Sequence, residues 1–246
     1  MNETPIRPFS LTLIYAVPAL VLLWVAVYPP YGLNLAISHL FGSADGFFMN
    51  RMPVMLFLHK VARVVPIASA AAVLLTLIVT FLRGGNVKFF GADRRRMFYL
   101  LAAMLASVML IKFLKQTTGV YCPTHITDFG GTEAVSAPIL SWVKQPGHCW
   151  PSGFAGTGFC MFALYFALRD VNIRAARKGF ALALGLGVFC SVVQIMRGEH
   201  FLSDTIASGV IDWLVCASLY ALFFGKGIVR MVRERGHRLA FSVREA

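Results

Sequence analysis

Three polar clusters, separated along the chain by apolar stretches, carry the residue types needed for phosphate chemistry. The first begins at Lys115, the second is Pro151-Ser152-Gly153, and the third contains Arg197, His200 and Asp204. Cationic side chains bind phosphoryl oxygens, and a serine and a glycine at a helix start add a hydroxyl and unpaired backbone N–H groups. His200 and Asp204 are four positions apart, so they share one face of a helix. The carboxylate would fix the tautomer of the imidazole and leave its other nitrogen free for attack.

The composition excludes an ordinary soluble domain. Of the 246 residues, 58% are hydrophobic and 14% are charged, whereas soluble domains carry about 25% charged residues. The long aliphatic runs and five cysteines also exclude a disordered chain and a disulfide-rich secreted scaffold. A net charge of +12 would suggest nucleic-acid binding in a soluble protein, but here the basic residues cluster between apolar runs. The sequence predicts an all-α, polytopic membrane protein that binds no nucleic acid.

A helix that crosses about 30 Å of hydrocarbon needs roughly 20 residues. Six stretches reach or approach this length: Leu11–Val27, Val64–Leu82, Met97–Leu114, Gly153–Leu168, Gly179–Met196 and Thr205–Phe224. The first is interpreted as a retained span, because it lacks the basic flank and cleavage site of a signal peptide. Residues 28–63 are too interrupted to span and are expected to form short interfacial helices. The predicted fold is one membrane domain, residues 1–246, with six transmembrane helices in a bundle.

The distribution of basic residues predicts the orientation. Most of them lie in the two termini, including the basic tail 225–246, and in the loops 83–96 and 169–178. Cytoplasmic loops carry the excess of lysine and arginine, so both termini are expected in the cytoplasm. The three polar clusters then lie together at the outer face of the membrane.

The order and spacing of the clusters resemble the type 2 phosphatidic acid phosphatase superfamily, with its pattern K-x6-R-P, P-S-G-H and S-R-x5-H-x3-D. The resemblance covers about residues 97–224 and implies a catalytic core there, within a six-helix bundle and without a cofactor or metal ion. It implies that Lys115, Ser152 and Gly153 hold the phosphoryl group. It also implies that His200 becomes a phosphohistidine and that Asp204 orients it.

Two positions depart from the arginines of this pattern. Cys122 stands at the first arginine position, and Gln194 stands where the arginine of the third motif is expected. A bacterial branch of the superfamily is similar in having C-P, C-[FW]-P-[SA]-G-H and R-G-x-H-F-x-S segments. By this resemblance the phosphate-binding role passes to Arg197.

Phe154 stands where the family has the histidine that protonates the leaving group, and a phenyl ring transfers no proton. Three explanations stay open. Another acid takes over, with His125, His148 and Glu199 nearest in sequence; the protein is a natural or engineered inactivated form; or it binds lipid phosphates without turning them over.

Cys122 and Cys149 fall in the predicted periplasmic segments, where an oxidising compartment permits a disulfide. Their bond would restrain the first two polar clusters relative to each other. No spacing of histidine, cysteine or carboxylate residues suggests a metal site.

The function predicted is a metal-independent phosphatase that hydrolyses a phosphomonoester or pyrophosphate on a membrane lipid. Its partners are the bilayer and an anionic lipid substrate; the resemblance suggests undecaprenyl pyrophosphate, phosphatidylglycerol phosphate, phosphatidic acid or lipid A phosphates. The alternatives are a lipid phosphotransferase and a non-catalytic or inactivated protein that binds or transports lipid phosphates. Charged groups within predicted spans, which often mark substrate pathways, support the latter.

Overall fold

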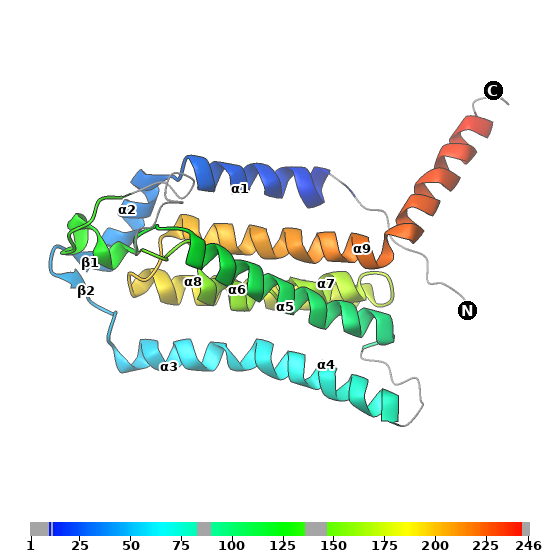
Figure 1. The fold of residues 1–246 in the computed structure, drawn as a ribbon, viewed down its shortest axis with the longest axis horizontal. Helices are drawn as coiled ribbons and strands as arrows, with labels where there is room; N and C mark the ends of the chain where they lie inside the picture. The colour runs from blue at the N-terminus through cyan, green and yellow to red at the C-terminus, as the bar shows by residue number, and fades with distance from the viewer. Residues whose placement is uncertain (1–9, 11, 83–89, 136–146, 243–246) are drawn as a thin grey trace.

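The computed structural model of the chain describes residues 10, 12–82, 90–135 and 147–242, with side chains as far as Gly225. Helices run along the long axis of the molecule (Figure 1). In chain order the elements are η1 (Thr12–Ala16), α1 (Val17–Val27), α2 (Tyr31–His39), β1 (Gly42–Ser43), β2 (Gly46–Phe47), α3 (Pro53–Ala62), α4 (Val64–Leu82), α5 (Arg94–Thr117), η2 (Pro123–His125), η3 (Thr127–Phe129), α6 (Gly153–Phe159), α7 (Phe162–Leu168), α8 (Ile173–Met196) and α9 (Leu202–Ser242).

Helices occupy all six predicted spans, but they differ in length. Within the part of the chain that the structure describes, four are long and apolar enough to cross a membrane: Pro53–Leu82, Arg94–Thr117, Ile173–Met196 and Leu202–Gly225. The bent pair Thr12–Val27 and Tyr31–His39, whose halves meet at 76°, is a fifth candidate. Gly153–Leu168 is apolar but shorter, so a bundle of six full spans remains a prediction.

The structure corrects the expectation that residues 28–63 form only short interfacial helices. α3 continues into α4 with the single turn residue Arg63 between them, so Pro53–Leu82 forms one helical rod of 30 residues. Pro66 explains the interruption, because it lacks an N–H and its ring crowds the carbonyl four residues earlier, at Ala62. α3, which carries His59 and Lys60 in its last turn, therefore extends toward the end of the bundle where the polar clusters lie (Figure 1).

α6 and α7 lie at the centre of the bundle, where glycines permit close helix packing. A Cβ on Gly158 would come within 2.7 Å of Gly187 Cα on α8, and a Cβ on Gly156 would lie 3.3 Å from Ile111 on α5. Small residues let helix backbones approach closely in membrane bundles. The start of α6 is thereby fixed against both α5 and α8.

The end of the bundle at α2 is covered by short elements (Figure 1). The hairpin β1–β2 has two antiparallel pairs, Gly42 with Phe47 and Ser43 with Gly46. Phe129 of η3 packs against Phe47 at a ring-centroid distance of 4.8 Å and belongs to one buried cluster with Phe201. The hairpin and η3 thus form a cap over this end of the bundle, and through Phe201 the cap holds the segment before α9 in place.

The opposite end of the bundle carries a buried ionic network. Arg96 Nη1 lies 3.3 Å from Asp170 Oδ2, which also accepts a 2.5 Å hydrogen bond from the Tyr220 hydroxyl. This is the end that the charge distribution assigns to the cytoplasm. Residues 83–89 and the side chains of the predicted basic tail lie outside the described residues.

Candidate active site

The three polar clusters predicted from the sequence meet at one end of the bundle, beneath the cap. Lys115 lies in the last turn of α5, Ser152 is the N-cap of α6, and Arg197 is the C-cap of α8. His200 precedes α9, and Asp204 lies in its first turn. Four helices thus end or begin at one place (Figure 1).

The start of α6 lies against the lysine. Ser152 is fully buried, and its Oγ accepts a 3.4 Å hydrogen bond from the Ala155 N–H. A Cβ on Gly153 would lie 3.8 Å from Lys115 Cδ, so the lysine stem passes beside the bare helix start. The first N–H groups of a helix have no partner inside it. An ammonium group and backbone donors are therefore available together for one anion.

His200 and Asp204 form a buried pair, each about 2% exposed. His200 Nδ1 lies 3.6 Å from Asp204 Oδ2, an ion-pair separation just beyond hydrogen-bond distance. Asp204 Oδ2 also accepts a 2.9 Å hydrogen bond from the Phe201 N–H. Because Nδ1 faces the carboxylate, Nε2 is the nitrogen left for a substrate.

Ser208, one turn after Asp204, connects the start of α6 to that of α9. Its hydroxyl lies 2.9 Å from the carbonyl oxygens of both Ser152 and Asp204, and the Ser152 N–H donates to the Asp204 carbonyl at 3.2 Å. The anion-binding serine and the carboxylate that faces His200 are therefore held in one hydrogen-bonded unit. Sequence reasoning missed Ser208, although its i+4 position relative to Asp204 was a usable signal.

Arg197 is held by three oxygens at the edge of the site. Its guanidinium donates to Gln194 Oε1 at 3.0 Å, to Glu199 Oε1 at 3.4 Å and to the Asn50 carbonyl at 3.4 Å. Gly198 permits the turn that follows, because its φ is +70° and a Cβ there would fall 2.2 Å from the Phe47 ring.

Phe154 is buried and faces two polar residues of the α3–α4 rod. Its ring centroid lies 4.1 Å from that of His59, and the Arg63 guanidinium carbon lies 5.6 Å from the same centroid. Arg63 Nη2 is 3.2 Å from His59 Nε2. Both arginines, Arg63 and Arg197, act electrostatically on His59. Neither His59 nor Arg63 was selected as a site residue from the sequence.

The three substitute acids suggested by the sequence have different surroundings. His125 is exposed in η2, whereas His148 is exposed with Nδ1 3.2 Å from the Lys115 carbonyl oxygen. Glu199 forms the ion pair with Arg197. Among the aromatic contacts of the described residues, Phe154 has a ring partner only in His59.

Cys122 and Cys149 form a disulfide with their Cα atoms 5.2 Å apart. It joins the segment before η2 to the segment before α6, and the Cys149 N–H donates to the Val120 carbonyl at 2.8 Å. Cys160, Cys190 and Cys216 are free and buried. The bond therefore restrains the chain on both sides of residues 136–146, which lie outside the described residues.

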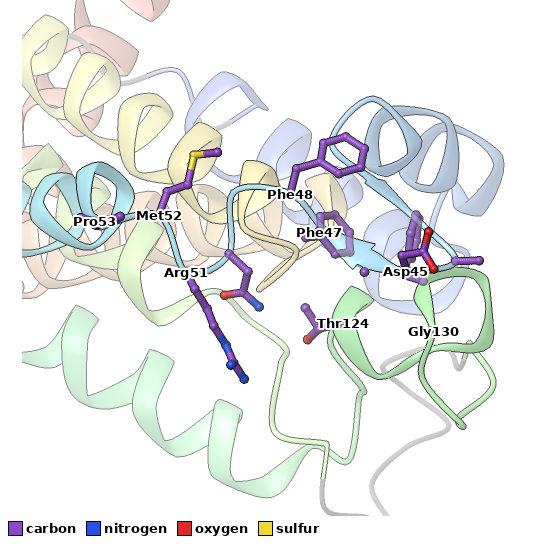
Figure 2. Close-up of a pocket in the computed structure, with 12 residues that line it drawn as sticks. Asp45, Phe47, Phe48, Arg51, Met52, Pro53, Thr124 and Gly130 are labelled. Atoms are coloured by element: carbon purple, nitrogen blue, oxygen red, sulfur yellow. The ribbon is translucent and has the colours of Figure 1, made fainter.

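A cavity of about 650 Å³ adjoins the site. Figure 2 shows that its lining side chains come from the segment around Asp45 and Arg51 and from the segment that carries Thr124 and Gly130. Two backbone contacts join its walls to the third polar cluster: the Asn50 carbonyl accepts from Arg197, and the Thr124 N–H donates to the Gly198 carbonyl at 3.1 Å.

Asn34 of α2 is another buried polar residue that reaches the site, through Ser203 beside Asp204. Within the described residues, no group of three or more His, Cys, Asp and Glu side chains is placed to hold a metal ion. The candidate site thus combines cationic side chains and backbone donors with a buried imidazole–carboxylate pair, an arrangement suited to an anion.

Comparisons with known proteins agree with this chemistry. The sequence model described as the PAP2 superfamily matches residues 96–228, which contain the three polar clusters. A relative described as lipid A 4'-phosphatase from Francisella tularensis subsp. novicida (strain U112) is 24% identical over 201 residues, which cover 78% of this chain and 83% of the relative. A crystal structure described as a transmembrane PAP2-type phosphatidylglycerolphosphate phosphatase from Bacillus subtilis has 18% identity and a TM-score of 0.45, covering 87% of this chain and 96% of that chain.

Proposed function

Because the chain belongs to the PAP2 superfamily, we propose that it is a phosphatase that hydrolyses a phosphomonoester or pyrophosphate on a membrane lipid. The observation that carries the proposal is the buried His200–Asp204 pair beside Lys115 and Ser152 at one end of a membrane bundle. The names of the two relatives, a lipid A 4'-phosphatase and a phosphatidylglycerolphosphate phosphatase, support a lipid phosphate as the substrate.

The proposed first step is an in-line attack of His200 Nε2 on phosphorus. The N–P bond forms as the bond to the leaving oxygen breaks, and Asp204 stabilises the positive charge that develops on the imidazole. Lys115, Arg197 and the Ser152-Gly153 segment bind the phosphoryl oxygens, where negative charge is distributed in the transition state. Water then cleaves the phosphohistidine and releases phosphate. This mechanism assigns no step to a metal ion.

The site is proposed to face the periplasm, with both termini in the cytoplasm of a bacterial cell. The described basic residues at the start of α5 and around the start of α8 support this orientation, since these helix starts lie at the end of the bundle opposite the start of α9 (Figure 1). The disulfide Cys122–Cys149 supports it as well, because disulfides persist in oxidising compartments. A lipid whose head reaches the outer leaflet would enter with its phosphate at the helix ends.

The cavity beside Arg197 offers room for the headgroup that bears the phosphate. Undecaprenyl pyrophosphate, phosphatidylglycerol phosphate, phosphatidic acid and lipid A phosphates all combine an anionic head with long apolar chains. A phosphotransferase would use the same first step and differ in the acceptor of the phosphoryl group.

Because Phe154 supplies no proton for a leaving group, one second candidate function is favoured, a protein that binds or transports lipid phosphates without hydrolysing them. Loss of a general acid lowers the rate by about 10²–10⁴-fold without abolishing it. Phosphate release at such a reduced rate would therefore still distinguish an enzyme from a binding protein.

The deciding experiment is phosphate release by purified protein from a panel of lipid phosphates in detergent micelles. Wild type is assayed beside His200→Ala and Phe154→His. Release that depends on His200 supports the phosphatase. Tight binding of the lipids without release, also in the Phe154→His variant, would replace the phosphatase with the binding protein.

A further inference from the structure

The side chain that packs against the Phe154 ring is a histidine, His59. The His59 ring lies with its centroid 4.1 Å from the Phe154 ring centroid, at an interplanar angle of 42°. The two residues come from distant parts of the sequence, one from α3 and one from the start of α6. Phe154 occupies the position at which the family has a histidine. An imidazole therefore lies beside this position, but α3 supplies it.

The surroundings of His59 belong to the phosphate-binding site. Arg63, one turn further along the rod, contacts His59 at 3.2 Å and lies over the Phe154 ring. Arg63 also interacts electrostatically with Lys115, and Arg197 does so with His59. Lys115 and Arg197 are the two cations assigned to the phosphoryl oxygens. The His59–Arg63 turn therefore lies within electrostatic range of those cations.

We propose that His59 is the general acid of this enzyme and takes the place of the imidazole that Phe154 does not provide. The proposal rests on the phosphatase function. The aromatic ring of Phe154 acts as the surface on which the His59 ring lies, and its burial among Met55, Ala62, Cys190 and Val193 keeps that surface fixed.

The proton balance of the reaction follows from these assignments. The substrate binds as the phosphomonoester monoanion and transfers its proton to His59 Nε2. In the first step the His200 N–P bond forms, the bond from phosphorus to the leaving oxygen breaks, and that oxygen takes this proton from the His59 imidazolium. In the second step water attacks phosphorus, the N–P bond returns its electron pair to His200, and neutral His59 takes the proton of the water. When phosphate leaves, it takes this proton from His59, so His59 ends the cycle neutral, as it began.

Arg63 positions the acid in the free site. A guanidinium only donates hydrogen bonds, so His59 Nε2 is the acceptor in the contact between them. A bound phosphoryl group offers Arg63 a charged acceptor instead. Nε2 is then released from Arg63 and can carry the proton for the leaving oxygen.

The other ionisable groups are less suited to this role. Glu199 is engaged by Arg197, and His148 lies next to the carbonyl of Lys115 at an exposed loop position. His125 is exposed in η2. His59, by contrast, is the aromatic ring partner of Phe154 among the described residues.

The test is the dependence of His59→Gln on the leaving group. With a lipid alkyl phosphate such as phosphatidic acid, kcat should fall by about 10²–10⁴-fold, because an alkoxide leaves poorly without a proton. With nitrophenyl phosphate the loss should stay within about tenfold, because that leaving group needs little protonation. Lys60→Gln, which removes a charge from the neighbouring exposed position of α3, should leave the ratio of the two activities unchanged.

A second variant covers the case in which His59→Gln loses activity on both substrates through misfolding. Phe154→His in the His59→Gln background should recover at least about tenfold of the activity on the alkyl phosphate, since it returns an imidazole to the same place. No recovery would overturn the assignment of His59.

Other outcomes also overturn it. One is that His59→Gln keeps its full activity on the alkyl phosphate. The other is that Lys60→Gln, Glu199→Gln or His148→Gln shows the selective loss of alkyl phosphate activity that is expected of His59→Gln. These outcomes leave the phosphatase function intact as long as wild type releases phosphate in a His200-dependent manner. A wild type that releases none would overturn both proposals.

Discussion

The side-chain amide of Asn34 forms two hydrogen bonds with Ser203, although the residues are 169 positions apart in the sequence. Asn34 Nδ2 donates to Ser203 Oγ at 2.8 Å, and the Ser203 N–H donates to Asn34 Oδ1 at 3.1 Å. Ser203 Oγ lies 3.4 Å from Asp204 Oδ1. All three residues are at most 2% exposed. α2 is thereby attached directly to the first turn of α9, next to the carboxylate that faces His200.

Asn34→Ala should lower both activity and stability. It leaves the buried Ser203 N–H without its partner, which costs about 1–3 kcal/mol, and it loosens the turn that positions Asp204. A shift of the catalytic pair by 1 Å costs up to about 10²-fold in kcat. The measurement is phosphate release together with thermal unfolding in detergent. Asn172→Ala is the matched control, because Asn172 caps α8 through a 3.0 Å bond to the Ala175 N–H. It should lose stability but keep kcat; a normal kcat in Asn34→Ala would contradict the positioning role.

His200→Ala should reduce kcat by about 10⁴-fold or more, because the proposed covalent step loses its nucleophile. Brief incubation of wild type with labelled lipid phosphate and an alkaline quench should leave an acid-labile phosphate on a peptide containing residue 200. The exposed His39 provides the control, since His39→Gln should keep both turnover and labelling. Turnover of His200→Ala within tenfold of wild type would exclude the phosphohistidine mechanism.

Asp204→Asn should preserve the fold around His200 but lower kcat by roughly 10³–10⁴-fold. The amide keeps an oxygen for the Phe201 N–H, but it cannot stabilise an imidazolium. The rate of phosphohistidine formation in single-turnover experiments should fall, while the affinity for a non-hydrolysable lipid phosphonate stays close to wild type. Equal losses of affinity and rate would instead indicate a structural role for Asp204.

The Cys122–Cys149 disulfide should be detectable by mass. Alkylation of denatured protein without reduction should modify the three free cysteines, and reduction before alkylation should raise the number to all five. Closure of 27 residues contributes about 3–4 kcal/mol in the chain-entropy description, so reductant should lower the unfolding temperature of wild type. The same reductant should not affect Cys122→Ser/Cys149→Ser. Five modified cysteines without reduction would contradict the disulfide.

Thiol labelling of intact spheroplasts tests the orientation. Because the native free cysteines are buried, single additions can be made in the natural background. Thr132→Cys lies at the exposed end that holds the site, and Arg174→Cys lies at the exposed start of α8 at the other end. An impermeant maleimide should modify the first variant in spheroplasts and the second only after permeabilisation. The reverse pattern would place the site in the cytoplasm.

The sequence alone was sufficient to predict that the residues of the main cluster lie together. Lys115, Ser152, Arg197, His200 and Asp204 stand at the ends of apolar stretches, and the structure brings these ends together. The prediction was possible because spans of similar length place alternate connections at the same face. A fixed helical period also puts residues four apart on one side.

The partners supplied by α2 and α3 were accessible only in the tertiary structure. The interrupted segment 28–63 suggested interfacial helices, so Asn34, His59 and Arg63 were not assigned to the site. The structure shows α3 continuing into α4 as one rod, and it shows α2 held against the start of α9.

The physical reason is that sequence patterns are local and helix contacts are not. Hydrophobicity and length indicate which residues can form a helix across a bilayer. Which faces meet depends instead on close packing along the whole bundle, as at Gly158 and Gly187, where only the absence of side chains lets two backbones touch. That packing fixes the start of α6, and only with that start in place does His59 of α3 lie over the ring of Phe154.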